Sequence, residues 1–309
     1  MNNIEINILK TFRGLSNNFL DNLFRVVSFL GEQYFVIAVI FIIFFFFDKK
    51  IGYHVMYSVL LGLCLNNSIK GLIKRPRPWV VDSTYEPASI AKPTATGYSF
   101  PSGHTQNVTT LLTSVSLEFK KKIIIISSII IICLVGFSRI LLGVHYPTDV
   151  LVGLLTGLLT AFSAYLITKF VKDEFKKMLL VIIATLIVFT PFVFVFFTKD
   201  SSQMIWQKDF YVAWFMLLGF LPGYIIESKV VQMEISKKFY INLLRFIGCL
   251  LMFGVTYLGL KFLFRQPLFP QDDNSFKFIF DGIRYFFVVF NCLGLYPLLF
   301  KNILFKKEQ

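Results

Sequence analysis

Long apolar segments separated by short polar connectors constrain the fold of this chain more than any other sequence feature. Because a helix of roughly 20 apolar residues crosses the hydrocarbon core of a bilayer, these segments are predicted to be membrane spans. They are 33–47, 51–73, 104–118, 123–142, 147–168, 178–197, 209–226, 239–263 and 278–300. The expected fold class is therefore all-α, a polytopic transmembrane helical bundle of about nine spans.

The composition agrees with a location in the membrane. Hydrophobic residues make up 56% of the chain and charged residues 16%, and the mean hydropathy is +0.68. Soluble domains contain roughly 45–50% apolar and about 25% charged residues, so a water-soluble globule, a disordered chain and a disulfide scaffold are disfavoured. The segment 104–118 is polar on one side, with Thr105, Gln106 and Thr109, and is expected inside the bundle.

The basic charge of the chain predicts its orientation rather than a nucleic-acid partner. The 31 Lys and Arg residues exceed the 18 Asp and Glu residues, and the net charge is +13. They form short clusters between apolar segments, and in a membrane protein such clusters mark the cytoplasmic side. The connectors expected there are 48–50, 118–122, 169–177, 227–238 and the tail after Phe300. This predicts a plasma-membrane protein with its N-terminus outside and its C-terminus in the cytoplasm.

Three regions are expected along the chain. Apolar and polar residues alternate at helical spacing along 1–28, so residues 1–32 are predicted to contribute an interfacial amphipathic helix. Residues 33–170 are predicted to form the membrane-embedded core that carries the chemistry. Residues 178–309 are predicted to add further transmembrane helices, to which the sequence assigns no role.

A basic cluster at 70–78 (KGLIKRPRP) lies on the outer side, where cations are disfavoured. Lys70 and Arg77 are close to two helical turns apart, and the adjacent prolines should end the helix before Arg77. Two cations converging from a helix and a loop suit an oxyanion, although a basic cluster at lipid headgroups has the same composition. Three neighbouring cations either guide an anionic substrate or touch lipid: Lys74, Arg75 and Lys92.

A second segment, 101–104 (PSGH), directly precedes an apolar run. Gly103 permits close backbone approach, and free amides at a helix start attract an anion. Ser102 adds a hydroxyl donor, and His104 would stand beside that anion, where it can pass a proton. Taken alone, the same residues are also typical of an ordinary turn and helix cap.

A third segment, 138–149 (SRILLGVHYPTD), contains a histidine and an aspartate four residues apart. Residues at this spacing share one helical face, so Asp149 can accept a ring N–H of His145 and raise its basicity. The other ring nitrogen of His145 is then free to act as a nucleophile. Arg139 brings a third cation. A capping Asp beside a solvated His is the alternative for this segment alone.

Taken together, the three segments resemble the type 2 phosphatidic acid phosphatase family, which shares its site with vanadium-dependent haloperoxidases. The family pattern is a Lys, six residues and Arg-Pro; then Pro-Ser-Gly-His; then Ser-Arg, five residues, His, three residues and Asp. Every motif position is matched between Lys70 and Asp149. The nine-span arrangement is in addition similar to the glucose-6-phosphatase branch.

The resemblance implies a phosphatase that needs no metal or other cofactor. His145 would attack phosphorus, Asp149 would orient His145, and His104 would protonate the leaving group. The residues that would hold the phosphate oxygens are Lys70, Arg77, Ser102, Gly103 and Arg139.

The expected substrate is a phosphorylated lipid such as phosphatidic acid, phosphatidylglycerol phosphate or a polyprenyl diphosphate. Two alternatives remain open, a sugar-phosphate phosphatase and a non-enzymatic lipid transporter. The partners expected are thus the lipid substrate and the bilayer, and no nucleic acid.

Overall fold

A computed structural model describes residues 2–172, 174–197, 201–266 and 274–305, and within these ranges the chain is helical and contains no strand. The described chain divides into two compact units. The first extends to Val39 and resumes from His54 to Ile167, and the second contains Ile40–Tyr53 and the described residues from Thr168 onward. The chain thus enters the second unit twice.

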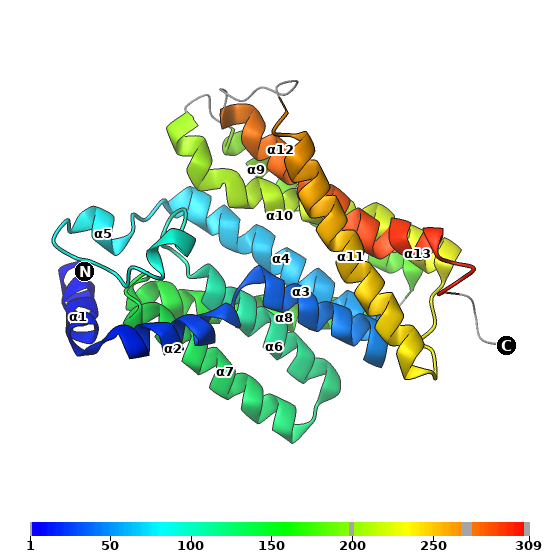
Figure 1. The fold of residues 1–309 in the computed structure, drawn as a ribbon, viewed down its shortest axis with the longest axis horizontal. Helices are drawn as coiled ribbons and strands as arrows, with labels where there is room; N and C mark the ends of the chain where they lie inside the picture. Colours follow the sequence, from blue (N-terminus) through cyan, green and yellow to red (C-terminus); the bar gives the residue numbers. More distant parts are fainter. Residues whose placement is uncertain (1, 173, 198–200, 267–273, 306–309) are drawn as a thin grey trace. The chain divides into compact units, whose positions relative to one another are not determined.

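The first unit is built around four long helices, α4, α6, α7 and α8, and also contains shorter ones (Figure 1). In chain order the helices are α1 (Asn2–Leu15), α2 (Asn18–Phe29), α3 (Gln33–Ile42), α4 (Lys49–Ile73), α5 (Pro78–Val81), α6 (Gly103–Phe119), α7 (Lys122–Leu141) and α8 (Pro147–Val171). The ends of α3 and α8 and the start of α4 belong to the second unit.

Helix α6 contacts α4, α7 and α8, and polar side chains on it are buried, as its sequence predicts. Gln106 accepts hydrogen bonds from Asn66 on α4 (2.6 Å) and from Thr156 on α8 (2.9 Å). Nearer the other end of α6, Ser114 lies 2.7 Å from Ser58 of α4. These bonds satisfy polar groups that lipid cannot, so they fix α6 against its neighbours.

Helices α6 and α8 approach closely because α8 carries glycine at the contact. A Cβ atom at Gly157 would lie 2.7 Å from Thr109 Cβ and 3.0 Å from the Gln106 carbonyl oxygen. One turn earlier, a Cβ at Gly153 would lie 2.7 Å from the Ser102 carbonyl oxygen. Small residues at such positions let helix backbones pack tightly in a membrane, and here they bring the start of α8 against the start of α6.

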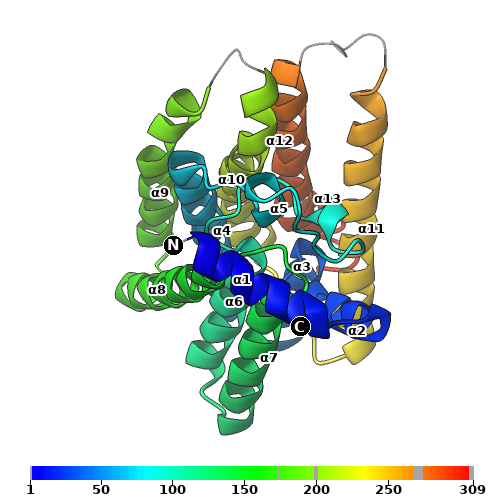
Figure 2. The same cartoon turned by 90° about the vertical axis from the view of Figure 1, so that its left-hand side faces the viewer.

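The N-terminal segment forms two helices rather than the single amphipathic helix predicted. The chain turns between α1 and α2, and Asn17 caps α2 by accepting a hydrogen bond from the Leu20 amide (3.0 Å). Ile6 and Leu9 of α1 are buried, and α1 and α2 both pack on α7 (Figure 2). One face of this segment therefore covers protein, and its position at the membrane interface stays a prediction.

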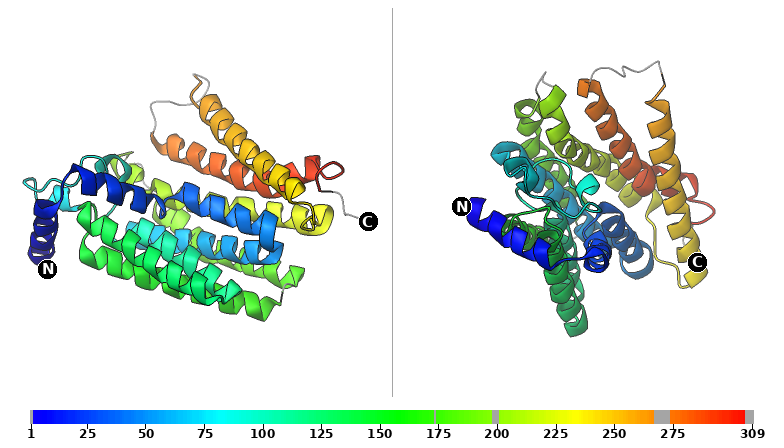
Figure 3. Two further views of the ribbon diagram at one scale, coloured as in Figure 1. Left: turned by 60° about the horizontal axis from the view of Figure 1, so that its bottom comes forward. Right: turned by 60° about the vertical axis from the view of Figure 1, so that its left-hand side comes forward.

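The second unit contains α9 (Phe175–Val195), α10 (Ser201–Ile226), α11 (Phe239–Leu263), α12 (Asn274–Phe290) and α13 (Tyr296–Leu299), with π-helical turns at Ile43–Phe47, Glu227–Val231 and Asn291–Leu295. Helices α11 and α12 are neighbours (Figure 3), and α10 packs closely on α12. The carboxylate of buried Glu227 accepts hydrogen bonds from Lys49 (3.0 Å) and from Tyr53. Glu227 thus holds the 40–53 segment within this unit.

Each of the nine predicted spans coincides with helical residues to within two residues at its ends, but the count of nine is not confirmed. Among the described residues, seven helices are long and apolar enough to cross a bilayer, or eight when the bent pair Asn18–Phe29 and Gln33–Phe47 is counted as one span. Helix α6 has only 17 residues and is polar on its buried side. The chain is a multi-pass membrane protein.

The glycine contact of α8 gives a test of this packing. We expect Gly157→Ala to destabilise the protein by about 1–3 kcal/mol, because overpacking a tight contact costs that much. The matched control is Gly259→Ala on α11, where a new Cβ meets nothing within 4 Å and alanine favours the helix. Thermal unfolding in detergent measures both variants. Equal melting temperatures for the two would contradict the close packing.

Candidate active site

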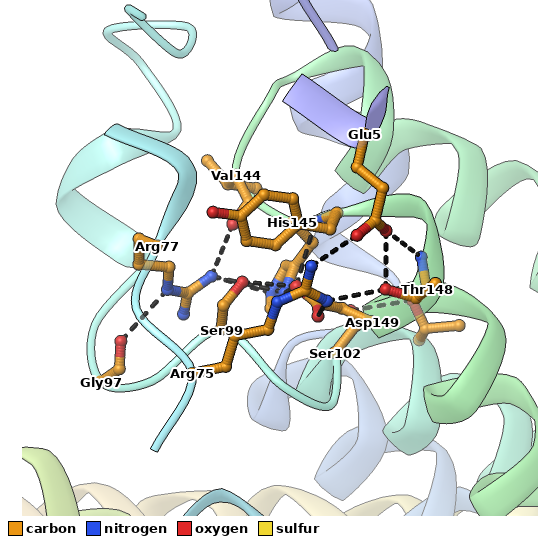
Figure 4. A network of polar contacts seen from close by, with 12 residues as sticks. Glu5, Arg75, Arg77, Gly97, Ser99, Ser102, Val144, His145, Thr148 and Asp149 are labelled. Carbon is orange, nitrogen blue, oxygen red and sulfur yellow. Dashed lines mark hydrogen bonds and ion pairs between the residues drawn. The ribbon is translucent and has the colours of Figure 1, made fainter. Parts of the chain in front are cut away.

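The three motif segments meet at one end of the first unit, around the loop that joins α7 to α8 (Figure 4). Helix α4 ends just after Lys70, and the following loop carries Arg77. Helix α6 starts at Gly103, and α7 ends just after Arg139. Segments far apart in the sequence therefore bring all eight predicted site residues to the same end of the helices.

His145 lies between a carboxylate and a guanidinium group. Its Nδ1 atom is 3.4 Å from Asp149 Oδ2, and Arg77 Nη1 lies closer to Nε2 (3.0 Å) than to Nδ1 (3.5 Å). A guanidinium group can only donate, so the facing Nε2 carries the lone pair and Nδ1 carries the hydrogen directed at Asp149. This tautomer is inferred from the hydrogen-bond partners, and it leaves Nε2 as the nucleophilic nitrogen.

The surroundings keep the His145 ring neutral. Its burial, followed by the positive charges of Arg77, Arg139 and Lys70, holds the pKa of His145 well below its usual value. Desolvation and nearby cations both disfavour the imidazolium form. At neutral pH the ring is therefore unprotonated, as a nitrogen nucleophile must be.

Asp149 is fully buried and receives hydrogen bonds from several segments. Arg75 Nη1 donates to Oδ1 at 2.8 Å. Oδ2 accepts from the Tyr146 amide at 3.0 Å and from the Ser99 hydroxyl. These donors fix the plane of the carboxylate and so the position from which it faces His145.

Arg77 is held by backbone carbonyls on both sides of the site. Its guanidinium group donates to Thr96 (2.7 Å), Gly97 (3.1 Å) and Val144 (2.7 Å). The side chain is only 3% exposed. Arg77 is therefore a fixed charge, and the loop before α6 is tied through it to the loop after α7.

Arg139 and His104 keep buried polar atoms without a partner in the described part of the chain. Arg139 donates to Ser28 through Nη1, whereas its Nε and Nη2 atoms and His104 Nε2 have no hydrogen-bond partner there. Arg139, His145, Lys70 and Arg77 all act electrostatically on His104. Leaving buried donors unpaired costs about 1–3 kcal/mol each, so this arrangement suits a bound anion.

The start of α6 is tied to the start of α8. The Ser102 amide donates to the Asp149 carbonyl oxygen (2.9 Å), and the Ser102 hydroxyl lies 2.9 Å from Thr105 Oγ1. A Cβ at Gly103 would lie 3.5 Å from Lys70 Nζ. The Lys70 ammonium group therefore stands beside the first amides of α6, which attract anions.

Sequence reasoning missed three residues that contact the site. Arg75, expected to guide substrate or to touch lipid, instead pairs with Asp149 and with Glu5 of α1 (Figure 4). Ser99, three residues before Ser102, donates to Asp149. The proximity of Arg75 and Ser99 to the motifs was an available signal, whereas Glu5 carried none.

No group of three or more His, Cys, Asp or Glu side chains in the described ranges is arranged to hold a metal ion. The acidic groups near His145, those of Asp149 and Glu5, are instead bonded to Arg75 and to hydroxyl or amide donors. Among the described residues, the buried polar atoms without partners near His145 include Nε and Nη2 of Arg139, Nε2 of His104 and the hydroxyl of Tyr146, and no carboxylate oxygen. This donor set is suited to an anion rather than to a cation.

Two family models match the chain. Residues 51–173 match the PAP2 superfamily, and residues 212–308 match the transmembrane extension of PAP2 superfamily phosphatases. The first match contains every motif residue from Lys70 to Asp149, and the second lies within the second compact unit.

Three relatives of known function are similar to the chain. An undecaprenyl-diphosphatase from Sulfolobus acidocaldarius is 34% identical, over 45% of this chain and 66% of the relative. Undecaprenyl-diphosphatase BcrC from Bacillus subtilis is 31% identical, over 50% and 79%. Phosphatidylglycerophosphatase B from the same organism is 31% identical, over 46% and 72%. The resemblance seen in the motifs is thereby confirmed, and the chain belongs to the PAP2 superfamily.

Proposed function

We propose that this protein removes the terminal phosphate of a membrane lipid through a covalent phosphohistidine. The observation that carries the proposal is the His145 ring, whose Nδ1 faces Asp149 while its Nε2 faces the guanidinium group of Arg77. A neutral imidazole oriented by a carboxylate and surrounded by fixed cations is suited to attack a phosphoryl group.

The reaction proceeds in two displacements. The reaction starts with His104 as an imidazolium ion, a form that the negative charge of the bound phosphate stabilises. His145 Nε2 attacks phosphorus, the bond to the lipid oxygen breaks, and His104 gives its proton to that leaving oxygen. His104 then takes a proton from water, and the resulting hydroxide attacks the phosphohistidine. The N–P bond breaks, inorganic phosphate leaves, and His145 is again neutral. This use of one residue as acid and then as base is general acid–base catalysis.

The phosphate oxygens are held by Lys70, Arg77 and Arg139 together with the start of α6. Arg139 Nε and Nη2, which have no partner among the described residues, are available for these oxygens. The Gly103 amide and the Ser102 hydroxyl complete the set. Preorganised donors of this kind stabilise the charge that spreads over the oxygens in the transition state.

The substrate class is a phosphorylated lipid. In support, the relatives named above act on undecaprenyl diphosphate and on phosphatidylglycerophosphate according to their names. The site also belongs to a multi-pass membrane chain with a strongly apolar surface. A sugar-phosphate phosphatase and a lipid transporter remain the alternatives. A transporter would not need the complete set of catalytic residues.

A substrate panel tests the proposal. We expect the purified protein in detergent to release phosphate from at least one of phosphatidic acid, phosphatidylglycerol phosphate, undecaprenyl diphosphate and lipid A. EDTA should leave the rate unchanged, since the steps above use no metal. Release from glucose 6-phosphate alone would favour the sugar-phosphate alternative. Release from no compound, together with lipid movement across liposomes, would favour the transporter.

The three histidines of the chain provide a matched set of variants. We expect His145→Asn to lower turnover by roughly 10³-fold or more and His104→Asn by roughly 10²- to 10⁴-fold. His54→Asn should stay within about twofold of wild type, since His54 pairs with Glu118 (3.1 Å) nearer the other end of α4. Acid-labile phosphate incorporated from labelled substrate measures the intermediate. Labelling retained in His145→Asn would refute the nucleophile.

The site is proposed to face the extracytoplasmic side of the plasma membrane, with the C-terminus in the cytoplasm. The support is the distribution of Lys and Arg between alternate connectors. A membrane-impermeant maleimide applied to intact cells should label Ser89→Cys in the loop before α6 and spare Glu234→Cys in the connector before α11. Both residues are exposed. Labelling of Glu234→Cys alone would reverse the orientation, and equal labelling would refute it.

A further inference from the structure

A buried carboxylate on the N-terminal helix has no part in the chemistry described so far. Glu5 of α1 is only 6% exposed. Neither its sequence neighbours nor any of the three motifs predicts a buried carboxylate at this position. Burying a carboxylate is costly unless charges and hydrogen bonds compensate it. The groups that compensate Glu5 therefore indicate why it is held in this place.

Both oxygens of Glu5 bind residues next to Asp149. Oε2 accepts a hydrogen bond from Arg75 Nη2 at 2.5 Å. Oε1 accepts from the Thr148 hydroxyl at 2.6 Å and from the Thr148 amide at 3.1 Å. That amide lies in the first turn of α8, where backbone donors have no partner within the helix. Glu5 thus ties α1 to Arg75 and to the start of α8.

Arg75 carries the contact onward to Asp149. Its Nη1 donates to Asp149 Oδ1 at 2.8 Å and to Thr148 Oγ1 at 2.7 Å. Its guanidinium plane lies 3.8 Å from the centre of the Tyr146 ring. Arg75 is therefore fixed by an aromatic face and by a carboxylate at each end (Figure 4).

We infer that Glu5 is a positioning residue, which holds Arg75 and through it the carboxylate that orients His145. The inference rests on the proposed function, because it gives Glu5 a task in the attack on phosphorus. Arg75 donates a hydrogen bond to Asp149 Oδ1, and the other carboxylate oxygen, Oδ2, therefore faces His145. Without Glu5, Arg75 keeps only one of its two carboxylate partners, and the plane of Asp149 is less well fixed.

The remaining contacts of α1 allow this role to be separated from simple anchoring. Ile6 and Leu9 pack in one cluster with Tyr85 and Tyr146, which holds the helix by apolar burial. Lys10 forms a second ion pair from the same helix, to Asp82 at 2.8 Å, with 44% of the Lys10 side chain exposed. Lys10 therefore tethers α1 at the surface without reaching Arg75 or Asp149, and it is the matched control.

The test compares Glu5→Gln, Glu5→Ala and Lys10→Ala, each normalised to the monodisperse fraction in detergent. We expect Glu5→Gln to lower kcat by roughly 10- to 100-fold, the usual effect of losing a group that orients a reacting residue. KM should stay within about twofold of wild type, because Glu5 contacts Arg75 and Thr148, which are not among the residues proposed to hold the phosphate. Lys10→Ala should retain wild-type kcat. Glu5→Ala should be at least as impaired as Glu5→Gln.

A double-mutant cycle distinguishes positioning from loss of structure. If Glu5 acts through Arg75, Glu5→Gln costs less than about twofold in kcat when added to Arg75→Gln. Additive losses, or losses matched by Lys10→Ala, would overturn the inference. So would a Glu5→Gln protein whose folded fraction keeps wild-type kcat, even if its melting temperature falls. A wild-type protein that releases no phosphate from any compound overturns the proposed function and this inference with it.

Discussion

The buried carboxylate of Asp149 is the contact on which the rest of the site depends. Its backbone carbonyl accepts from the Ser102 amide, one oxygen accepts from Arg75, and the other accepts from Ser99. Asp149 belongs to the third motif segment, and it therefore joins the first segment through Arg75 and the second through Ser102. Each of these donors offsets part of the cost of burying the acid, so Asp149 joins the assembly of the site to the orientation of His145.

Positive charge is divided between two tasks in this site. Arg75 is neutralised by Glu5 and Asp149, and its role is to hold other groups. Arg77 is held by backbone carbonyl oxygens, and Nε and Nη2 of Arg139 have no hydrogen-bond partner among the described residues, so both side chains can direct positive charge at an anion. Such charge is unfavourable in a buried position without an anion, and a phosphoryl group supplies that anion. The carboxylates of Glu5 and Asp149 thus pair with Arg75, and they leave Arg77 and Arg139 to bind the phosphoryl group.

The sequence predicted those features that depend on local pattern. Each expected span coincides with helical residues to within two residues at its ends, and the polar face of α6 is buried as its Thr and Gln residues indicate. The motif residues also lie close together. This was predictable because the spacing of the cations, His and Asp indicates that they surround one anion. Helical periodicity likewise predicted a helix near the N-terminus, but it did not predict the break at Ser16 and Asn17, where Asn17 caps α2.

Features that depend on distant pairs were beyond such reasoning. Glu5 and Thr148 are 143 residues apart, and neither residue signals the other. The amphipathic pattern of α1 shows that one face is apolar, but it does not reveal that Ile6 and Leu9 pack on tyrosines beside the site. In the same way, no sequence pattern in residues 40–53 predicts that Lys49 and Tyr53 donate hydrogen bonds to Glu227. Local sequence patterns identify the side chains that can react. The side chains that hold them in place are brought near by tertiary contacts, and we infer that Glu5 is one of these.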